Sequence, residues 1–159
     1  MASKTIPSGI WRGRLTNQFL NKEFLIFTFA LFVSLVLHIL ITFNFYFPGN
    51  IITMPLTGGM LFAWLYSSAV LKDISASRKD FSFKFLLSHF HPFIKYSLLL
   101  LTVYAIFNFF NTFSLYSDEN WLDLDLDYNK LRGISGFWIV FYMLGLSGSI
   151  LKVKFNTDQ

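Results

Sequence analysis

The residues best suited to chemistry in this chain are polar side chains that lie inside otherwise apolar stretches. His38 is the clearest case, because an ionisable residue within a membrane-spanning segment is by default a functional candidate. Five more residues join it in a candidate polar cluster: Tyr104, Asn108, Ser135, Trp138 and Tyr142. Two interpretations are open. A hydrogen-bonded knot, with His38 donating to Asn108, would fix helix register. A small outward-facing polar pocket would instead bind a solute or move a proton.

Other patterns that could bind a metal are incomplete. The segment Asp123–Asp127 alternates like the start of an EF-hand loop, but Tyr128 and Ile134 stand where that loop needs a glycine and an acidic residue. His89 and His91 have no third ligand close by in the sequence. Cysteine is absent, as are the HExxH, GxSxG and phosphate-loop motifs. We therefore expect no metal site and no cofactor, and the sequence favours a non-enzymatic protein over an enzyme.

Four long apolar stretches must position the polar cluster. They comprise Phe24–Phe43, Ile51–Leu71, Phe93–Phe113 and Ile134–Leu151. About 20 apolar residues form a helix that crosses a bilayer. Charged residues make up only 14% of the chain, against about 25% in soluble domains. The sequence thus predicts an all-α integral membrane protein, with residues 1–159 forming one membrane domain and a four-transmembrane-helix bundle.

The distribution of basic residues predicts how the chain is threaded. The first 23 residues, the connection between the second and third spans and the C-terminal tail hold 11 of the 13 Lys and Arg residues. Cytoplasmic loops collect these residues, so both termini should be cytoplasmic and the acidic loop 114–133 should lie outside. The net charge of +4 then reflects topology and attraction to anionic lipid, and no nucleic-acid partner is expected. Amphipathic segments at Ile10–Leu20 and Phe83–Phe90 should lie at the membrane interface.

Small and polar residues recur on one face of each span, which is how helices pack in lipid. The second span carries a stripe of Gly59, Ala63 and Ser67. The fourth carries a seam at heptad spacing: Ser135, Trp138, Tyr142, Gly145 and Ser149. These faces should point inward in a left-handed bundle. The threading places His38, Asn108 and Trp138 at a similar depth, in the outer half of the membrane.

The last third of the chain carries three short motifs that resemble a known group. They read Pro92-x-x-Lys95, Tyr104-Ala105-x-x-Asn108-Phe109 and Arg132-Gly133-x-Ser135-Gly136-x-Trp138-x-x-Phe141-Tyr142. This pattern resembles small four-span bacterial inner-membrane proteins of unassigned function. In that group a histidine precedes the tryptophan, whereas Phe137 stands there in this chain. The resemblance implies the four-span fold and a bacterial inner membrane, and it implies no reaction.

Three functions are compatible with these patterns. The favoured one is a non-enzymatic accessory, assembly or partner-binding subunit, whose partner besides the lipid bilayer is a membrane protein or a second copy of the chain. The alternative is a small-solute or proton-linked transport component that uses the polar pocket and dimerises. A lipid-modifying enzyme based on His38 ranks last, because no acidic partner for that histidine lies within a span.

Overall fold

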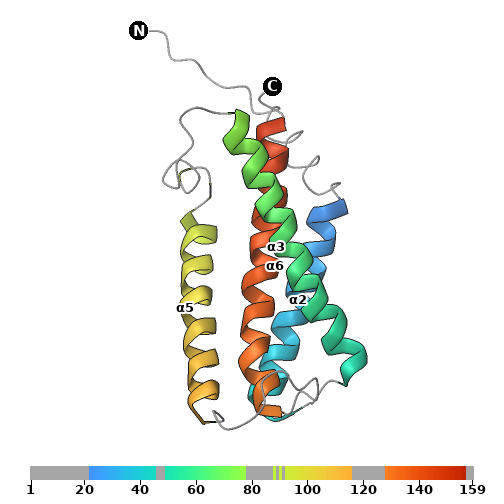
Figure 1. Ribbon diagram of the computed structural model, residues 1–159, viewed down its shortest axis with the longest axis vertical. Helices are drawn as coiled ribbons and strands as arrows, with labels where there is room; N and C mark the ends of the chain where they lie inside the picture. Colours follow the sequence, from blue (N-terminus) through green and yellow to red (C-terminus); the bar gives the residue numbers. More distant parts are fainter. Residues whose placement is uncertain are drawn as a thin grey trace.

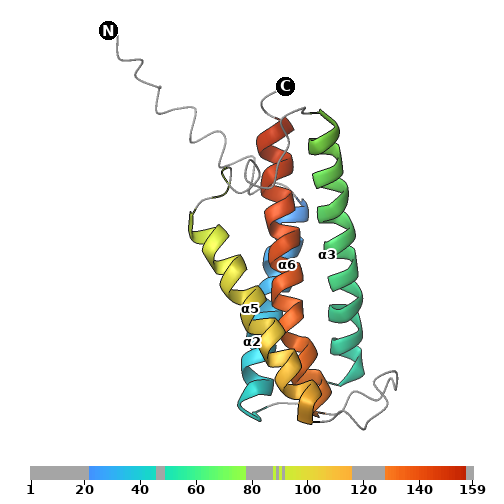
Figure 2. The same ribbon diagram turned by 60° about the vertical axis from the view of Figure 1, so that its left-hand side comes forward.

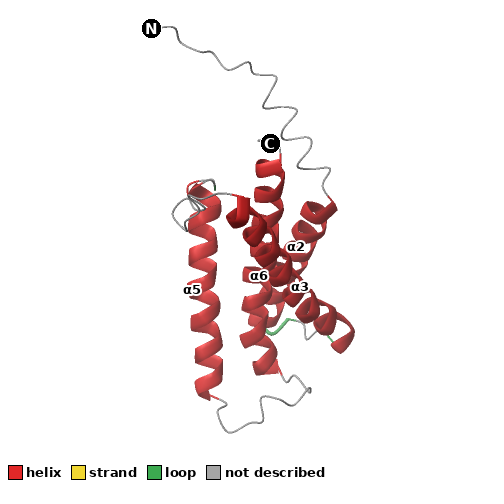
Figure 3. Cartoon of the chain, turned by 45° about the horizontal axis from the view of Figure 1, so that its top comes forward, coloured by secondary structure: helices red, strands yellow, loops and turns green. Residues whose placement is uncertain are grey.

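The computed structural model describes residues 22–45, 49–77, 88, 90, 92–115 and 128–156. Within these ranges the long elements are all helices, and no strand is present (Figure 3). The helices are α2 (Lys22–Thr42), α3 (Asn50–Ser77), α5 (Pro92–Leu115) and α6 (Tyr128–Asn156). All four are long and apolar enough to cross a membrane. The predicted all-helical architecture with four helices of membrane-spanning length is therefore confirmed, and it indicates a multi-pass membrane protein.

Helix α6 is the axis of the molecule (Figures 1 and 2). Helices α2, α3 and α5 each pack extensively along α6, whereas α2 and α3 barely touch and α5 makes no extensive contact with either of them. In the most apolar part of each helix, 67% of the α6 residues are buried, against 11% to 28% in the other three. The arrangement is thus a bundle around one central helix, which differs from the expected convergence of four equivalent inward faces.

Glycines explain why three helices can approach α6. A Cβ atom on Gly136 would lie 3.4 Å from the Ala105 Cα of α5. On Gly145 it would lie 2.6 Å from the Phe27 ring of α2, and on Gly148 it would lie 3.4 Å from the α3 backbone. Each neighbour therefore meets α6 where α6 has no side chain, which allows close backbone approach in lipid.

All four helices begin before the predicted spans, and α3 and α6 extend furthest beyond them. Helix α3 continues through the charged pair Lys72 and Asp73 to Ser77, and α6 begins at Tyr128. The predicted outer loop 114–133 is therefore too long, because its residues 128–133 form the first turns of α6 and residues 114–115 belong to α5. Hydropathy marks where a chain enters the hydrocarbon core, and a helix does not have to end at that boundary. The EF-hand-like segment, His89, His91, Ile10–Leu20 and most of Phe83–Phe90 lie outside the described residues.

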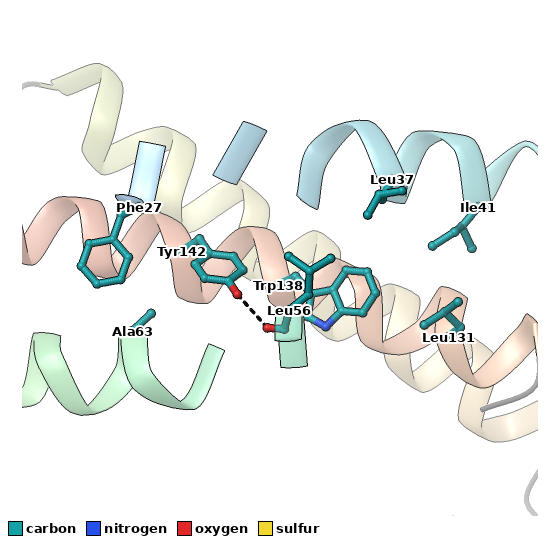
Figure 4. Close-up of a cluster of buried hydrophobic side chains, with 8 residues drawn as sticks. All are labelled: Phe27, Leu37, Ile41, Leu56, Ala63, Leu131, Trp138 and Tyr142. Carbon is teal, nitrogen blue, oxygen red and sulfur yellow. Dashed lines mark hydrogen bonds between the residues drawn. The ribbon is translucent and has the colours of Figure 1, made fainter. Parts of the chain in front are cut away.

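The chain alternates direction, so the helix ends gather at two ends of the molecule (Figure 1). At the Lys152 end, α2 and α5 begin while α3 and α6 finish; at the Arg132 end, α2 and α5 finish while α3 and α6 begin. Among the described residues, most buried apolar side chains belong to two clusters. The larger comprises Phe27, Leu37, Ile41, Leu56, Ala63, Leu131, Trp138 and Tyr142 (Figure 4). The smaller lies at the Lys152 end and comprises Val70, Ile74, Leu151 and Phe155.

Candidate functional site

His38 joins three helices toward the Arg132 end. Its Nδ1 atom lies 2.7 Å from the Ser135 Oγ atom of α6, and its Nε2 atom lies 2.7 Å from the Tyr104 Oη atom of α5. The histidine is 5% exposed and Ser135 is fully buried. Tyr104 is 40% exposed, so its ring faces outward while its hydroxyl reaches inward. We call His38, Ser135 and Tyr104 the histidine triad.

The hydrogen bonds of the triad assign its protons. The Ser135 hydroxyl donates to the Arg132 carbonyl at 2.9 Å, so its oxygen accepts from Nδ1–H of His38. The other ring nitrogen then accepts from the Tyr104 hydroxyl, because a neutral imidazole has one donor and one acceptor. Both ring nitrogens are therefore satisfied by the protein.

Asn108 belongs to the same network but does not bond to His38. Its Nδ2 atom donates at 2.8 Å to the Arg132 carbonyl, the group that also accepts from Ser135. The expected bond between His38 and Asn108 is thus replaced by a link through α6. The physical reason is the close approach of α5 at Gly136, where an added Cβ would lie 3.6 Å from Asn108 Nδ2. That approach brings the amide to the α6 backbone.

The remaining two cluster residues bond to α3. The Trp138 Nε1–H donates to Thr57 Oγ1 at 3.2 Å. The Tyr142 hydroxyl donates to the Leu56 carbonyl at 2.8 Å (Figure 4). Both aromatic residues are buried. The six predicted residues therefore form two hydrogen-bonded groups: one joins α6 to α2 and α5, and the other joins α6 to α3.

The predicted packing residues lie at helix contacts. Gly59 sits against the Tyr142 hydroxyl, and any Cβ there would overlap that oxygen. Ala63 is fully buried and Ser67 is 6% exposed, and both lie on the side of α3 that faces α6. Gly145 accommodates the Phe27 ring, as described above. Ser149 is fully buried and donates to the carbonyl of Leu146 in its own helix.

Sequence reasoning missed several contacts that hold α6 in place. Tyr128 donates to the Ile41 carbonyl of α2, and Lys152 pairs with Glu23 of α2, with 3.3 Å between Nζ and Oε1. Leu131, also missed, is fully buried. The signal was available, because the 3-and-4 spacing of the α6 seam reaches Tyr128, Leu131 and Lys152 when it is continued in both directions.

The chemistry open to the histidine triad is limited. It places a histidine between two hydroxyls, whereas a nucleophile–base triad also needs a group such as a carboxylate to orient the histidine. Among the described residues there is no group of three or more His, Cys, Asp or Glu side chains that could hold a metal ion. No protein-family model, curated protein or solved structure matches the chain. The contacts of the described helices therefore carry the functional conclusion.

Proposed function

We propose that this protein is a non-enzymatic accessory subunit that binds a membrane-protein partner along α5. The observation that carries the proposal is the one-sided attachment of that helix. Among residues 92–112 of α5, whose burial is described, the buried ones are Ala105, Asn108 and Thr112, all in the second half of the helix. None of residues 92–103 is buried, and the first half of α5 leans away from α6 (Figure 2).

A helix whose first half has no buried residue between positions 92 and 103 suits an intermolecular contact there. Helices in lipid associate through packing and interhelical hydrogen bonds, since lipid offers little hydrophobic drive. The exposed face of α5 carries large side chains that could pack in this way: Phe93, Tyr96, Leu99, Leu100 and Val103 are each at least 60% exposed. The saturated histidine triad adds support, because its polar groups hold α2, α5 and α6 together and leave no free ring nitrogen for a substrate.

Site-specific photocrosslinking in intact membranes tests this proposal. A photoreactive residue replaces Leu100 on α5, which is 72% exposed, and Phe32 on α2, which is 65% exposed, serves as the matched control. We expect one discrete protein adduct from position 100 and only lipid adducts from position 32. An adduct of twice the chain mass would identify a second copy as the partner. Lipid adducts alone at both positions would contradict the proposal.

We further propose that the Lys152 end faces the cytoplasm of a bacterial cell and that the protein lies in the inner membrane. The support is the concentration of Lys and Arg in the segments near that end, together with the resemblance noted above. Because the chain lacks cysteine, single cysteines report topology cleanly. An impermeant maleimide applied to intact cells should label Ser117→Cys and leave Ser77→Cys unlabelled, and the reverse pattern would invert the assignment.

A proton-linked transport component is the second candidate. The observation that favours it is an unbroken hydrogen-bonded chain from Tyr104 through His38 and Ser135 to the Arg132 carbonyl. Proton flux into liposomes that contain the purified protein would test it. If transport is the function, His38→Leu should abolish flux while the protein stays folded. Equal flux from wild type and His38→Leu would reject this candidate.

A further inference from the structure

A pocket with a volume of about 360 Å³ lies at the Lys152 end between α3 and α6. On α3 its walls include Tyr66, Val70, Asp73 and Ile74, which recur on one face of successive turns. The last turns of α6 contribute Lys152 and Phe155. The volume falls within the range of small-molecule sites, about 300–1,000 Å³. The pocket shares no residue with the histidine triad.

The pocket spans the level at which charged residues begin on both helices. Val70 and Phe155 are buried in the apolar cluster of this end, while Asp73 and Lys152 are the charged groups of the lining. In a membrane protein this transition marks the boundary between hydrocarbon and head groups. An occupant that matches the walls is therefore amphipathic, with an apolar part beside Val70 and Phe155 and a charged part beside Asp73 and Lys152.

Lys152 is held in place before any ligand binds. Its Nζ atom lies 3.3 Å from the Glu23 Oε1 atom and 5.6 Å from the centre of the Tyr66 ring. An ammonium group has three donors, and the ion pair with Glu23 uses one of them. The others are available to a phosphate oxygen. The fixed position lowers the entropic cost of capturing that group.

Asp73 is suited to bind a positively charged group on the same ligand as that phosphate. Its side chain is exposed, and it makes no hydrogen bond or ion pair to another described residue. A carboxylate accepts hydrogen bonds from a primary ammonium, which a trimethylammonium cannot donate. The lining thus carries one acidic and one basic residue, Asp73 and Lys152, which favours a head group that carries both signs of charge over one that is only anionic.

We infer that this pocket binds a phospholipid whose head group joins a phosphate to a primary ammonium, as in phosphatidylethanolamine. The phosphate lies against Lys152 and the ammonium against Asp73. The glycerol and first acyl carbons rest on Val70 and Phe155. The inference is independent of the proposed function, because the pocket lies between α3 and α6 and its lining includes no residue of α5.

Native mass spectrometry of the delipidated full-length protein tests the inference. The protein is offered equal amounts of phosphatidylethanolamine, phosphatidylcholine and phosphatidylglycerol with identical acyl chains. Wild type should retain the ethanolamine lipid about tenfold more strongly than the other two, the size expected for one hydrogen bond to a charged group. Equal retention of all three lipids would overturn the inference.

Variants locate the binding to the pocket. Asp73→Asn should remove most of the preference for the ethanolamine lipid over the choline lipid, and the exposed position of Asp73 keeps this variant folded. Lys72→Gln, an exposed neighbour that does not line the pocket, is the matched control and should keep the preference. Lys152→Gln should weaken retention of all three lipids through loss of the phosphate contact. An unchanged preference in Asp73→Asn would overturn the inference even if Lys152→Gln fails to fold.

Discussion

Helices α5 and α6 have the same mean hydropathy over their most apolar windows, yet 11% of the residues in one window and 67% in the other are buried. What separates them is side-chain size. Helix α6 carries four glycines at its contacts, whereas α5 has none and is rich in phenylalanine. In lipid both compositions are equally apolar, so hydropathy does not sort the helices. Close packing at small residues does, and it places α6 at the centre.

The largest expected effect comes from filling a contact glycine of α6. Gly145→Leu would drive a side chain into the Phe27 ring, which is itself 1% exposed and cannot swing into open space. Overpacking of this kind costs about 3 kcal/mol in the free energy of unfolding. The measurement is steric trapping or denaturant titration in bicelles. Gly58→Leu is the matched control, because nothing lies within 4 Å of its Cβ position; equal destabilisation by the two would refute the packing account.

Helix α3 allows the same comparison on adjacent residues. Ala63 is fully buried against α6, whereas Phe62 is 59% exposed. We expect Ala63→Leu to cost about 2 kcal/mol in the free energy of unfolding, and Phe62→Leu to cost far less. Thermal unfolding in mild detergent can compare them. If Phe62→Leu unfolds at as low a temperature as Ala63→Leu, the claim that the Ala63 side of α3 packs against α6 is wrong.

The next-largest loss in the free energy of unfolding is expected at the histidine triad. His38→Leu removes two interhelical hydrogen bonds, which average about 0.6 kcal/mol each within membranes, for a loss of about 1 kcal/mol. Tyr104→Phe removes one of them and should cost about half as much. A double-mutant cycle between positions 38 and 104 should yield the coupling. Zero coupling in that cycle would show that the bond contributes nothing to holding α5.

The smallest effect is expected on the exposed face of α5. Phe107 is 70% exposed, so Phe107→Leu in the isolated protein should change the free energy of unfolding by less than about 0.5 kcal/mol. Phe109 packs edge-on against Phe137 of α6, with 5.5 Å between ring centres. Phe109→Leu should therefore cost about 1 kcal/mol. The comparison would fail if Phe107→Leu proved the more harmful in thermal unfolding.

The sequence was sufficient for the four spans, because each is an apolar stretch of bilayer length with at most one charged residue, a pattern that depends on no tertiary contact. It was also sufficient for the buried seam of α6, from Ser135 to Ser149, which is a matter of periodicity. The hydrogen-bond partners could not be derived. His38 found Ser135 and Tyr104 instead of Asn108, and such choices depend on rotation about each helix axis, where one residue corresponds to about 100°. The central position of α6 could not be derived either, because it is set by tertiary contacts between the helices.

The central helix also constrains how the molecule is made. Helices α2, α3 and α5 precede α6 in the chain and have little contact with one another. Because synthesis proceeds from the N-terminus, we expect these three helices to remain unpacked in the bilayer until α6 has been synthesised. A ribosome that stalls before Tyr128 would leave three inserted but unassembled helices, exposed to membrane quality-control proteases. Conversely, α6 supplied as a separate peptide should gather the other three, so this fold can be reconstituted by complementation in trans.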